Sequence, residues 1–368
     1  MTSINNLLIE NHVAVSSLES PKHATQKNPN ILSAIWFIGK RCNYSCSYCS
    51  PYLHDNYSPH IKLADAVGFI DSLAAHSEEQ NKEVKITITG GEPFIHPDFL
   101  KILKHIKTKR NVVMLCVVSN GSLPFELYKQ SAEYVTNLTI SFHLEQPDKT
   151  ISSTIEKILK LNQVKNLFLN VNLMAAPGKF GQVKNIEQIF LENSVKYITR
   201  KIDPPVSNPV PATTKKTYAE KGEDIDDYFK HKIDYKNTNN QQLDILWKEY
   251  YSQEELDYLS TTNAQTWNNI RLHTDNGYIE TNTDTIKSQG LNSWQGWLCY
   301  AGIDIINIQF DGTVWRGQCM AGEPIGKLGE TIKWTTNPLV CPLKYCECGS
   351  DMAARKAKNK KYIEKIDD

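Results

Sequence analysis

The stretch RCNYSCSYCS, residues 41–50, follows the apolar run IWFIG at residues 35–39 and places Cys42, Cys46 and Cys49 in one short loop. The C-x3-C-x2-C spacing lets this loop present three thiolates to one inorganic cluster, which is one ligand fewer than an ordinary four-cysteine iron-sulfur site uses. We therefore expect one iron of such a cluster to stay available for a substrate or cofactor.

Other uses of these thiols remain open on the residues alone. A zinc knuckle needs four nitrogen or sulfur ligands, and His54 or His60 could supply the fourth. Plain structural thiols are a second alternative. A disulfide scaffold fits less well, because such scaffolds are short and cysteine-dense, whereas this chain has 9 cysteines in 368 residues.

The composition limits the partners. Lys plus Arg and Asp plus Glu number 41 each, so no overall field attracts nucleic acid or a membrane surface. The first 20 residues lack a basic segment followed by an unbroken apolar one, and no later stretch is long enough to span a bilayer. We expect a cytoplasmic protein, and in that reducing compartment the cysteines favour metal ligation.

Apolar strand-like runs alternate with segments of helical period from Ile35 onward, which is typical of a parallel sheet with crossover helices. Six such runs in succession predict an α/β fold, a partial (βα)6 barrel over residues 31–202 preceded by a lead-in at 1–30. The expected strands are 35–39, 84–90, 112–120, 135–143, 166–174 and 195–202, and the expected helices are 63–75, 96–109, 124–132, 150–162 and 183–193.

The regular pattern ends at Asp203, where a proline-rich segment removes backbone donors. Residues 203–269 are expected to be a linker or lid insertion, with a helix-like part at 244–260. The Tyr, Trp and Asp residues of 218–295 could form a substrate lid or an ordinary packed insertion. A small α+β domain is expected over 270–350, and the basic tail 351–368 is expected to be a solvated helix end; a polyanion contact is the alternative.

A glycine-rich segment ends one of the predicted strands, and polar residues end two others. Because ligands collect at the carboxyl ends of parallel strands, these residues are site candidates. They are Gly90, Gly91, Glu92 and Pro93 after the second strand, Ser119 and Asn120 after the third, and Ser141 and His143 after the fourth. The two glycines lack Cβ atoms and would allow a ligand to approach the backbone closely.

The cysteine triad, with Tyr48 before its last member and GGEP about 40 residues on, resembles the signature of the radical S-adenosylmethionine (radical SAM) superfamily. The resemblance implies a [4Fe-4S] cluster whose open iron chelates SAM, and reductive cleavage of SAM to methionine and a 5′-deoxyadenosyl radical. It also implies that GGEP meets the SAM amino group and that the later strand ends contact its ribose or carboxylate. The cofactor-binding residues implied in this way are Tyr48, Gly90, Gly91, Glu92, Pro93, Ser119, Asn120, Ser141 and His143, with Met174 and Ala175 on the adenine side.

Five further cysteines follow in the C-terminal region. The segment 296–328 is predicted to be a hairpin with its turn at Asp311-Gly312, which would bring together the cysteines at its two ends. This region resembles the twitch and SPASM auxiliary-cluster domains and implies a second [4Fe-4S] cluster; a zinc ribbon is the alternative. The implied ligands are Cys299, Cys319 and two of Cys341, Cys346 and Cys348. Cys116, inside an apolar strand, is interpreted as a small buried hydrophobe or, alternatively, as a hydrogen-atom donor.

The resemblance implies an enzyme that abstracts hydrogen from a C–H bond of a small metabolite, sugar or peptide, with oxidation, epimerisation or crosslinking as the outcome. A ribosomal-peptide maturase is an alternative in the same superfamily. The expected electron donor is a reductase such as flavodoxin or ferredoxin. The alternative of another class is a non-catalytic iron-sulfur or zinc protein, which would need neither GGEP nor the polar strand ends.

Overall fold

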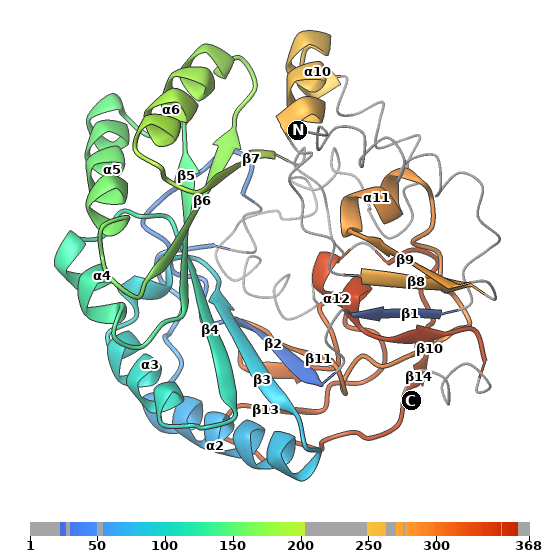
Figure 1. The fold of residues 1–368 in the computed structure, drawn as a ribbon. Helices are drawn as coiled ribbons and strands as arrows, with labels where there is room; N and C mark the ends of the chain where they lie inside the picture. The colour runs from blue at the N-terminus through green and yellow to red at the C-terminus, as the bar shows by residue number, and fades with distance from the viewer. Residues whose placement is uncertain are drawn as a thin grey trace, which may run out of the picture.

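The computed structural model describes residues 23–26, 30–49, 54–202, 249–262, 270–274, 277–346 and 348–359. Within these residues the chain forms two sheets, a large mostly parallel one and a smaller antiparallel one beside it (Figure 1). Residues 203–248 and 263–269, which include most of the expected linker or lid, lie outside the described residues.

Six parallel strands form most of the large sheet, from β2 to its edge at β7, and confirm the predicted partial barrel. They are β2 (Ile31–Phe37), β3 (Glu83–Thr89), β4 (Val112–Ser119), β5 (Asn137–His143), β6 (Phe168–Ala175) and β7 (Tyr197–Lys201). The crossover helices cover the outer side of the curved sheet (Figure 1). They are α2 (Leu63–Glu79), α3 (Phe99–Lys107), α4 (Phe125–Ser131), α5 (Asp148–Leu161) and α6 (Phe180–Glu192), with the short 3-10 helix η1 (Pro93–Ile95) before α3.

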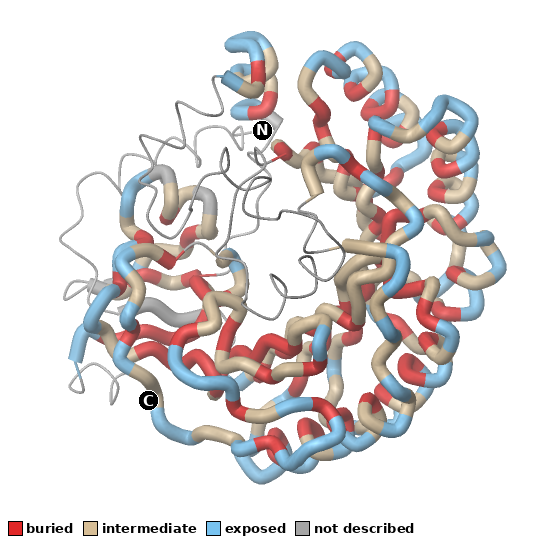
Figure 2. The backbone as a smooth tube through the Cα atoms, turned by 180° about the vertical axis from the view of Figure 1, so that it is seen from behind, coloured by how far each residue is buried: buried red, intermediate tan, exposed pale blue. Residues whose placement is uncertain are grey.

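The alternation of side chains along each strand explains why this sheet buries one face. In β2, Leu32, Ala34 and Trp36 are buried against the helices, whereas the residues between them are half-buried. Successive side chains of a strand point to opposite faces, so the half-buried residues form the inner side of the barrel. The ring of Trp36 packs edge-on against Phe69 of α2 with 5.6 Å between centroids. The buried residues lie along the strands and the inner sides of the helices (Figure 2).

The predicted C-terminal hairpin is present, and it extends the barrel sheet. Its strands are β11 (Ile305–Ile308) and β12 (Thr313–Trp315), followed by β13 (Gly326–Lys327). Gly312 in the turn has a φ of 83°, which a residue without Cβ adopts at little cost. β11 pairs in parallel with β2, with Ile305 beside Ser33, so the sheet continues from the barrel into the C-terminal region.

The small sheet collects short strands from both ends of the chain in the order β14-β10-β15-β1-β8-β9. They are β14 (Leu339–Val340), β10 (Leu298–Cys299), β15 (Lys356–Ala357), β1 (His23–Gln26), β8 (Ile270–Thr274) and β9 (Gly277–Thr281). Helices α11 (Thr283–Ser288) and α12 (Gly349–Ala353) lie beside this sheet (Figure 1). The end of the lead-in is therefore an ordered strand.

The expected helix at 244–260 appears as α10 (Gln253–Thr262), while residues 244–248 lie outside the described residues. Just before α10, the Tyr251 hydroxyl accepts from the Ile202 backbone N–H at 2.8 Å and donates to the Ala175 carbonyl at 2.9 Å. These bonds hold the chain against the ends of β6 and β7.

The expectation of a solvated helix end is wrong for the first part of the basic tail. Arg355 and Lys356 are buried, and Lys356 begins strand β15 between β1 and β10. Cross-strand pairing with two distant segments overrides the local signal of a basic sequence.

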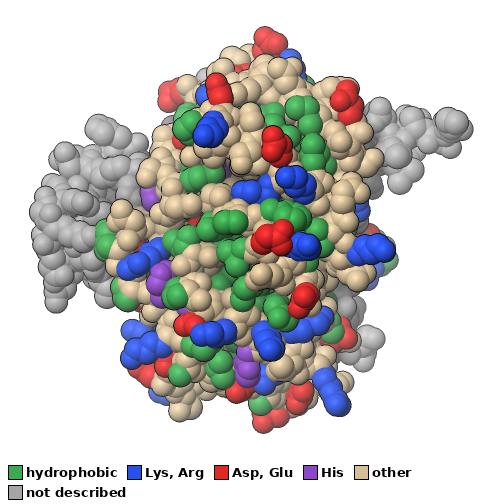
Figure 3. All heavy atoms as spheres, turned by 90° about the vertical axis from the view of Figure 1, so that its left-hand side faces the viewer, with side chains coloured by type: hydrophobic (Ala, Val, Ile, Leu, Met, Phe, Trp, Pro, Cys, Tyr) green, Lys and Arg blue, Asp and Glu red, His purple; other side chains and the backbone are tan. Residues whose placement is uncertain are grey.

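The helical side of the barrel carries both signs of charge close together (Figure 3), in keeping with the balanced composition. No helix in the described part of the chain is both long and apolar enough to cross a membrane.

Candidate functional site

The cysteine loop leaves the end of β2 and is bonded to the end of β3. The N–H groups of Gly91 and Glu92 donate to the carbonyls of Gly39 and Arg41 at 2.9 and 2.7 Å. The Cys42 N–H donates to the Asp55 carbonyl at 2.8 Å, which ties the loop to the chain that follows it.

The two glycines of GGEP allow this close approach of one chain segment to another. A Cβ at Gly91 would lie 2.1 Å from the Arg41 carbonyl oxygen, and one at Gly90, whose φ is 139°, would lie 2.5 Å from that of Gly39. Their neighbour is therefore the cysteine-bearing segment itself, whereas the sequence suggested that they admit a ligand.

Glu92 is 2% exposed and its carboxylate holds the ends of β3 and β4 together. It accepts from the N–H of Asn120 at 2.6 Å, the N–H of Phe94 at 3.0 Å and the hydroxyl of Ser119 at 2.9 Å. Burial outweighs these donors and raises the pKa of Glu92 to about 7. Pro93 is buried at the first position of η1. Both Glu92 and Ser119 thus bond protein groups behind the loop.

Side chains from the ends of β4 and β5 surround two of the loop sulfurs. The Asn120 amide donates to Cys42 Sγ at 3.7 Å, and the Gln146 amide donates to Cys46 Sγ at 4.0 Å. His143 Nδ1 lies 3.5 Å from Cys46 Sγ. Hydrogen bonds to thiolate sulfur are one of the means by which a protein stabilises and tunes an iron-sulfur cluster. The donor set therefore fits a cluster held by three cysteines.

His143 and Tyr48 form a packed pair over Cys46. The Tyr48 hydroxyl is hydrogen-bonded to His143 Nδ1, and the rings stack with centroids 5.9 Å apart. Burial lowers the pKa of His143 to about 4, so its imidazole is neutral near pH 7. Burial also raises the pKa of Cys46 to about 11, and a metal must displace this proton when it binds.

The loop is also fixed on its outer side. The exposed Glu145 accepts from the Ser47 N–H at 2.8 Å, and Asn43 bonds to the Asn120 amide at 2.9 Å and the Ser122 hydroxyl at 2.8 Å. The ends of β3, β4 and β5 thus all hold the cysteine loop in place.

A small pocket lies beside the loop, between the ends of β4 and β5 and the start of α5. Its lining combines aromatic, hydroxyl and amide groups. The residues are Tyr44, Asn120, Phe142, His143, Gln146, Thr150, Ile151 and Thr154.

Ser141 faces the inner side of the barrel and is half-buried, as is Met174. The register places Ser141 beside Asn172 and His143 beside Met174. Ala175, by contrast, is fully buried on the helix-facing side of β6, so its side chain is not available to an adenine ring. The inner side of β5 and β6 is mainly polar.

The C-terminal cysteines gather at the small sheet. Cys299 ends β10 and packs in one cluster with Cys341, while Cys346 packs against Trp294 and Met352. The Cys319 N–H donates to the Asp351 carboxylate of α12 at 2.6 Å. Cys348 precedes α12 as its N-cap residue. The fold therefore brings the region's five thiols to one end of the molecule.

Lys356 and Asp351 are the buried charges of this region. Burial by itself lowers the pKa of Lys356, but negative charge on Cys299, Cys346 and Asp351 more than offsets this effect and the pKa is raised. Burial raises the pKa of Asp351 and of Cys319. The positive charge of Lys356 therefore interacts with several of the thiols.

Of the two histidines considered for a zinc site, His60 packs its ring on that of His96, with centroids 4.8 Å apart. Across the described ranges, no three His, Cys, Asp or Glu side chains meet closely enough to hold a single metal ion. Cys116 is half-buried in β4, paired in register with Thr87 and Asn137.

Several residues of these sites were missed by the sequence analysis. Glu145 and Gln146 lie two and three residues past His143, the last residue of β5, so the signal of a polar strand end extends to them. Tyr44 lies inside the cysteine loop, and its place between Cys42 and Cys46 is the signal that points to it. Lys356 and Asp351 had none, because their position depends on pairing with β10 and on the turn at Cys319.

The sequence of the barrel region is similar to that of known proteins. Residues 36–171 match the family model described as the radical SAM superfamily. A GTP 3′,8-cyclase of Haemophilus influenzae is 31% identical over 110 residues, which are 28% of this chain and 31% of that protein. One of Campylobacter jejuni is 29% identical over 183 residues, 44% of this chain and 56% of that protein. The matches thus span only about a third to a half of these relatives' lengths.

Among solved structures, Streptococcus suis SuiB bound to S-adenosylmethionine is 15% identical, with a TM-score of 0.46 over 82% of this chain and 64% of that one. Native anSMEcpe with bound AdoMet is 13% identical, with a TM-score of 0.46 over 82% of this chain and 79% of that one. The family match begins near the end of β2 and covers the cysteine loop and the GGEP segment. Residues 36–171 of this chain are therefore similar to the radical SAM superfamily.

Proposed function

We propose that this chain is a radical SAM enzyme in which Cys42, Cys46 and Cys49 hold a [4Fe-4S] cluster that binds SAM at its open iron. With its SAM, such a cluster supplies a one-electron reductive cleavage that yields a 5′-deoxyadenosyl radical. The observation that supports the proposal best is the environment of the loop sulfurs, where Asn120 and Gln146 donate to Cys42 and Cys46.

The protein groups around the loop would position the cofactor. Glu92 and the two glycines keep the loop against the ends of β3 and β4, and the stacked Tyr48–His143 pair lies beside Cys46, with His143 Nδ1 3.5 Å from the sulfur. The adjacent pocket offers hydroxyl and amide groups for polar parts of SAM. A neutral His143 can accept or donate one hydrogen bond there without adding charge.

We further propose that the C-terminal thiols hold a second, auxiliary [4Fe-4S] cluster, as in twitch-like domains. Cys299, Cys319 and Cys346 would be ligands, and either Cys341 or Cys348 the fourth. The support is their gathering around Lys356 and Asp351 from segments far apart in sequence. A zinc ribbon remains the alternative for this set.

The proposed substrate is a polar small metabolite, sugar or peptide from which hydrogen is abstracted. The half-buried residues on the inner side of β5 and β6 support a polar substrate, since Thr139 pairs with Asn170 and Ser141 with Asn172. Oxidation, epimerisation and crosslinking are the proposed outcomes, and a peptide maturase is the alternative. GTP belongs among the first compounds to test, because the matched curated relatives are GTP 3′,8-cyclases. The proposed electron donor is a flavodoxin or ferredoxin.

The deciding experiment is anaerobic reconstitution followed by incubation with SAM and dithionite. We expect 5′-deoxyadenosine from the wild type and from Glu126→Gln, whose side chain is 70% exposed on α4, and none from Cys42→Ala. Equal product from Cys42→Ala, or none from the wild type once about eight irons are loaded, would contradict the proposal.

The auxiliary cluster has a separate test. Iron and sulfide assays should find about eight irons per wild-type chain and about four in Cys299→Ala. About four irons together with one zinc in the wild type would favour the zinc ribbon.

A further inference from the structure

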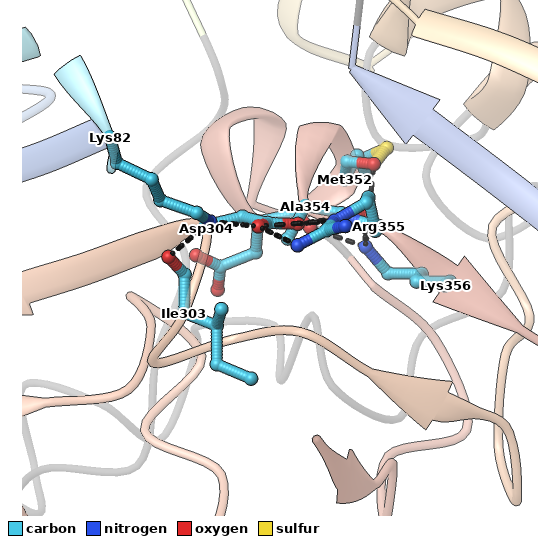
Figure 4. Close-up of polar contacts among 8 residues, drawn as sticks. Lys82, Ile303, Asp304, Met352, Ala354, Arg355 and Lys356 are labelled. Carbon is cyan, nitrogen blue, oxygen red and sulfur yellow. Dashed lines mark hydrogen bonds and ion pairs between the residues drawn. The ribbon is translucent and has the colours of Figure 1, made fainter. Parts of the chain in front are cut away.

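Lys356 places a positive charge in the interior of the small sheet. The residue is 1% exposed, and its Nζ donates to the carbonyls of Asp351, Met352 at 3.3 Å and Ala354 at 3.0 Å (Figure 4). On another side the ammonium lies 4.7 Å from the centre of the Trp294 ring. The side chain is thus held in one position by the end of α12.

The backbone pairing brings this charge to the cysteines. Lys356 lies opposite Cys299 in the antiparallel pair of β15 and β10. α12, whose carbonyls hold the ammonium, follows Cys348 directly and carries the Asp351 that binds the Cys319 N–H. The same short helix therefore positions Lys356 relative to thiols from both ends of the region.

The neighbouring residue shows what a neutralised buried cation looks like in this fold. Arg355 forms a bidentate pair with Asp304, with Nε and Nη2 each 2.9 Å from a carboxylate oxygen, and Lys82 reaches the same carboxylate at 2.8 Å (Figure 4). In the described part of the chain no such carboxylate lies within 4 Å of Lys356 Nζ. Its close partners are carbonyl dipoles and a ring face.

Removing an ammonium from water costs several kcal/mol, and dipoles recover only part of this. The buried carboxylate of Asp351 supplies part of the balancing charge from beyond 4 Å, and an anion beside the Lys356 side chain would supply the rest. A cluster with four thiolate ligands is such an anion, and the thiols that could hold it are the groups gathered here.

We propose that Lys356 is a positioning residue for the auxiliary cluster, whose negative charge it balances and whose reduction potential it raises. This inference rests on the second cluster of the proposed function. A cation next to the cluster stabilises the form with one more electron, so its loss should make reduction harder.

The test compares Lys356→Gln and Lys356→Arg in the full, anaerobically reconstituted chain. Both side chains keep N–H donors for the α12 carbonyls, but only arginine keeps the charge. Redox titration followed by electron paramagnetic resonance gives the potential of each cluster, and the cluster at Cys42, Cys46 and Cys49 serves as the internal reference. We expect Lys356→Gln to shift the one-electron reduction of the auxiliary cluster at least tenfold towards the oxidised form, about 59 mV, with the reference unchanged. Lys356→Arg should retain the wild-type potential.

Loss of auxiliary iron in Lys356→Gln but not in Lys356→Arg would also support the proposal, because charge would then be needed to hold the cluster. Equal potentials in the two variants at full loading, or equal loss of iron in both, would show that Lys356 only supports α12 and would overturn it. A wild type with about four irons and a single paramagnetic species would instead remove the auxiliary cluster itself.

Discussion

The buried carboxylate of Glu92 should make the stability of this protein fall as the pH rises. Its pKa is about 7 in the folded chain against 4.5 for an ordinary glutamate. Between these two values the native state keeps a proton that the unfolded chain has lost. The contribution of this group is therefore complete below about pH 4.5 and is lost as the pH rises through about 7.

The size of the effect follows from the two pKa values. Integrating the difference in bound protons from about pH 5.5 to about pH 8 gives a loss of about 2 kcal/mol from this one group. The glutamine of Glu92→Gln has nearly the same volume but does not titrate. The contribution of residue 92 to the pH dependence of the free energy of unfolding therefore disappears in this variant. A loss of about 2 kcal/mol corresponds to ~4–8 °C in Tm for a medium-sized domain, and we expect the lower end for a chain of this length.

Differential scanning calorimetry under argon at several pH values measures this difference. We expect the Tm of wild type minus that of Glu92→Gln to fall by about 4 °C between the two pH limits. Glu126→Gln is the matched control, because the Glu126 side chain is 70% exposed on α4, and its curve should run parallel to that of the wild type. Parallel curves for wild type and Glu92→Gln would refute the reasoning, since burial would then not have shifted this carboxyl.

Three further substitutions test the packing that positions the site. Gly91→Ala should lower Tm and iron loading, because its Cβ would lie 2.1 Å from a backbone carbonyl, whereas Gly39→Ala, with nothing within 4 Å, should load iron normally. Asp304→Asn should lower the free energy of unfolding by ~3–5 kcal/mol, because it leaves the buried Arg355 and the partly buried Lys82 without their carboxylate; denaturant titration measures this. Tyr251→Phe should cost ~1–3 kcal/mol by the same measurement, since it leaves a buried N–H and a buried carbonyl without their partner.

Clear outcomes would contradict each of these. If Gly91→Ala and Gly39→Ala loaded iron equally well, the close approach of the two segments would not matter for the loop. An Asp304→Asn variant as stable as the wild type would show that water or other groups replace the carboxylate. Unchanged stability of Tyr251→Phe would mean that the segment before α10 contributes little to holding the barrel end.

Much of the barrel was predictable because its signals are local. The alternation in β2 to β7 and the helical period between them depend on neighbours within a few residues, and all six strands appear where the pattern predicted them. The cysteine triad and GGEP lie at adjacent strand ends because parallel strands carry their carboxyl ends to one edge. The Asp311-Gly312 turn is a local signal of the same kind.

The roles of individual residues at the site were less accessible. Glu92 and Ser119 end strands as expected, yet both bond to protein groups behind the loop. At the end of a strand, a side chain can point towards the ligand site or towards the protein behind the loop, and the packing of the following loop decides between the two. A residue type and a position in the chain do not carry that information.

The sequence by itself determined the six-strand barrel and a loop with three closely spaced thiols, because strand alternation and ligand spacing are written in consecutive residues. Only the tertiary structure decided that β11 continues the barrel sheet from β2, and that Lys356 is buried opposite Cys299 although its surroundings in sequence are basic and polar. Both depend on pairing between segments separated by at least 57 positions, from 299 to 356, and up to 272, from 33 to 305. Such pairings are chosen by the free energy of the whole packed chain, which no local pattern reports.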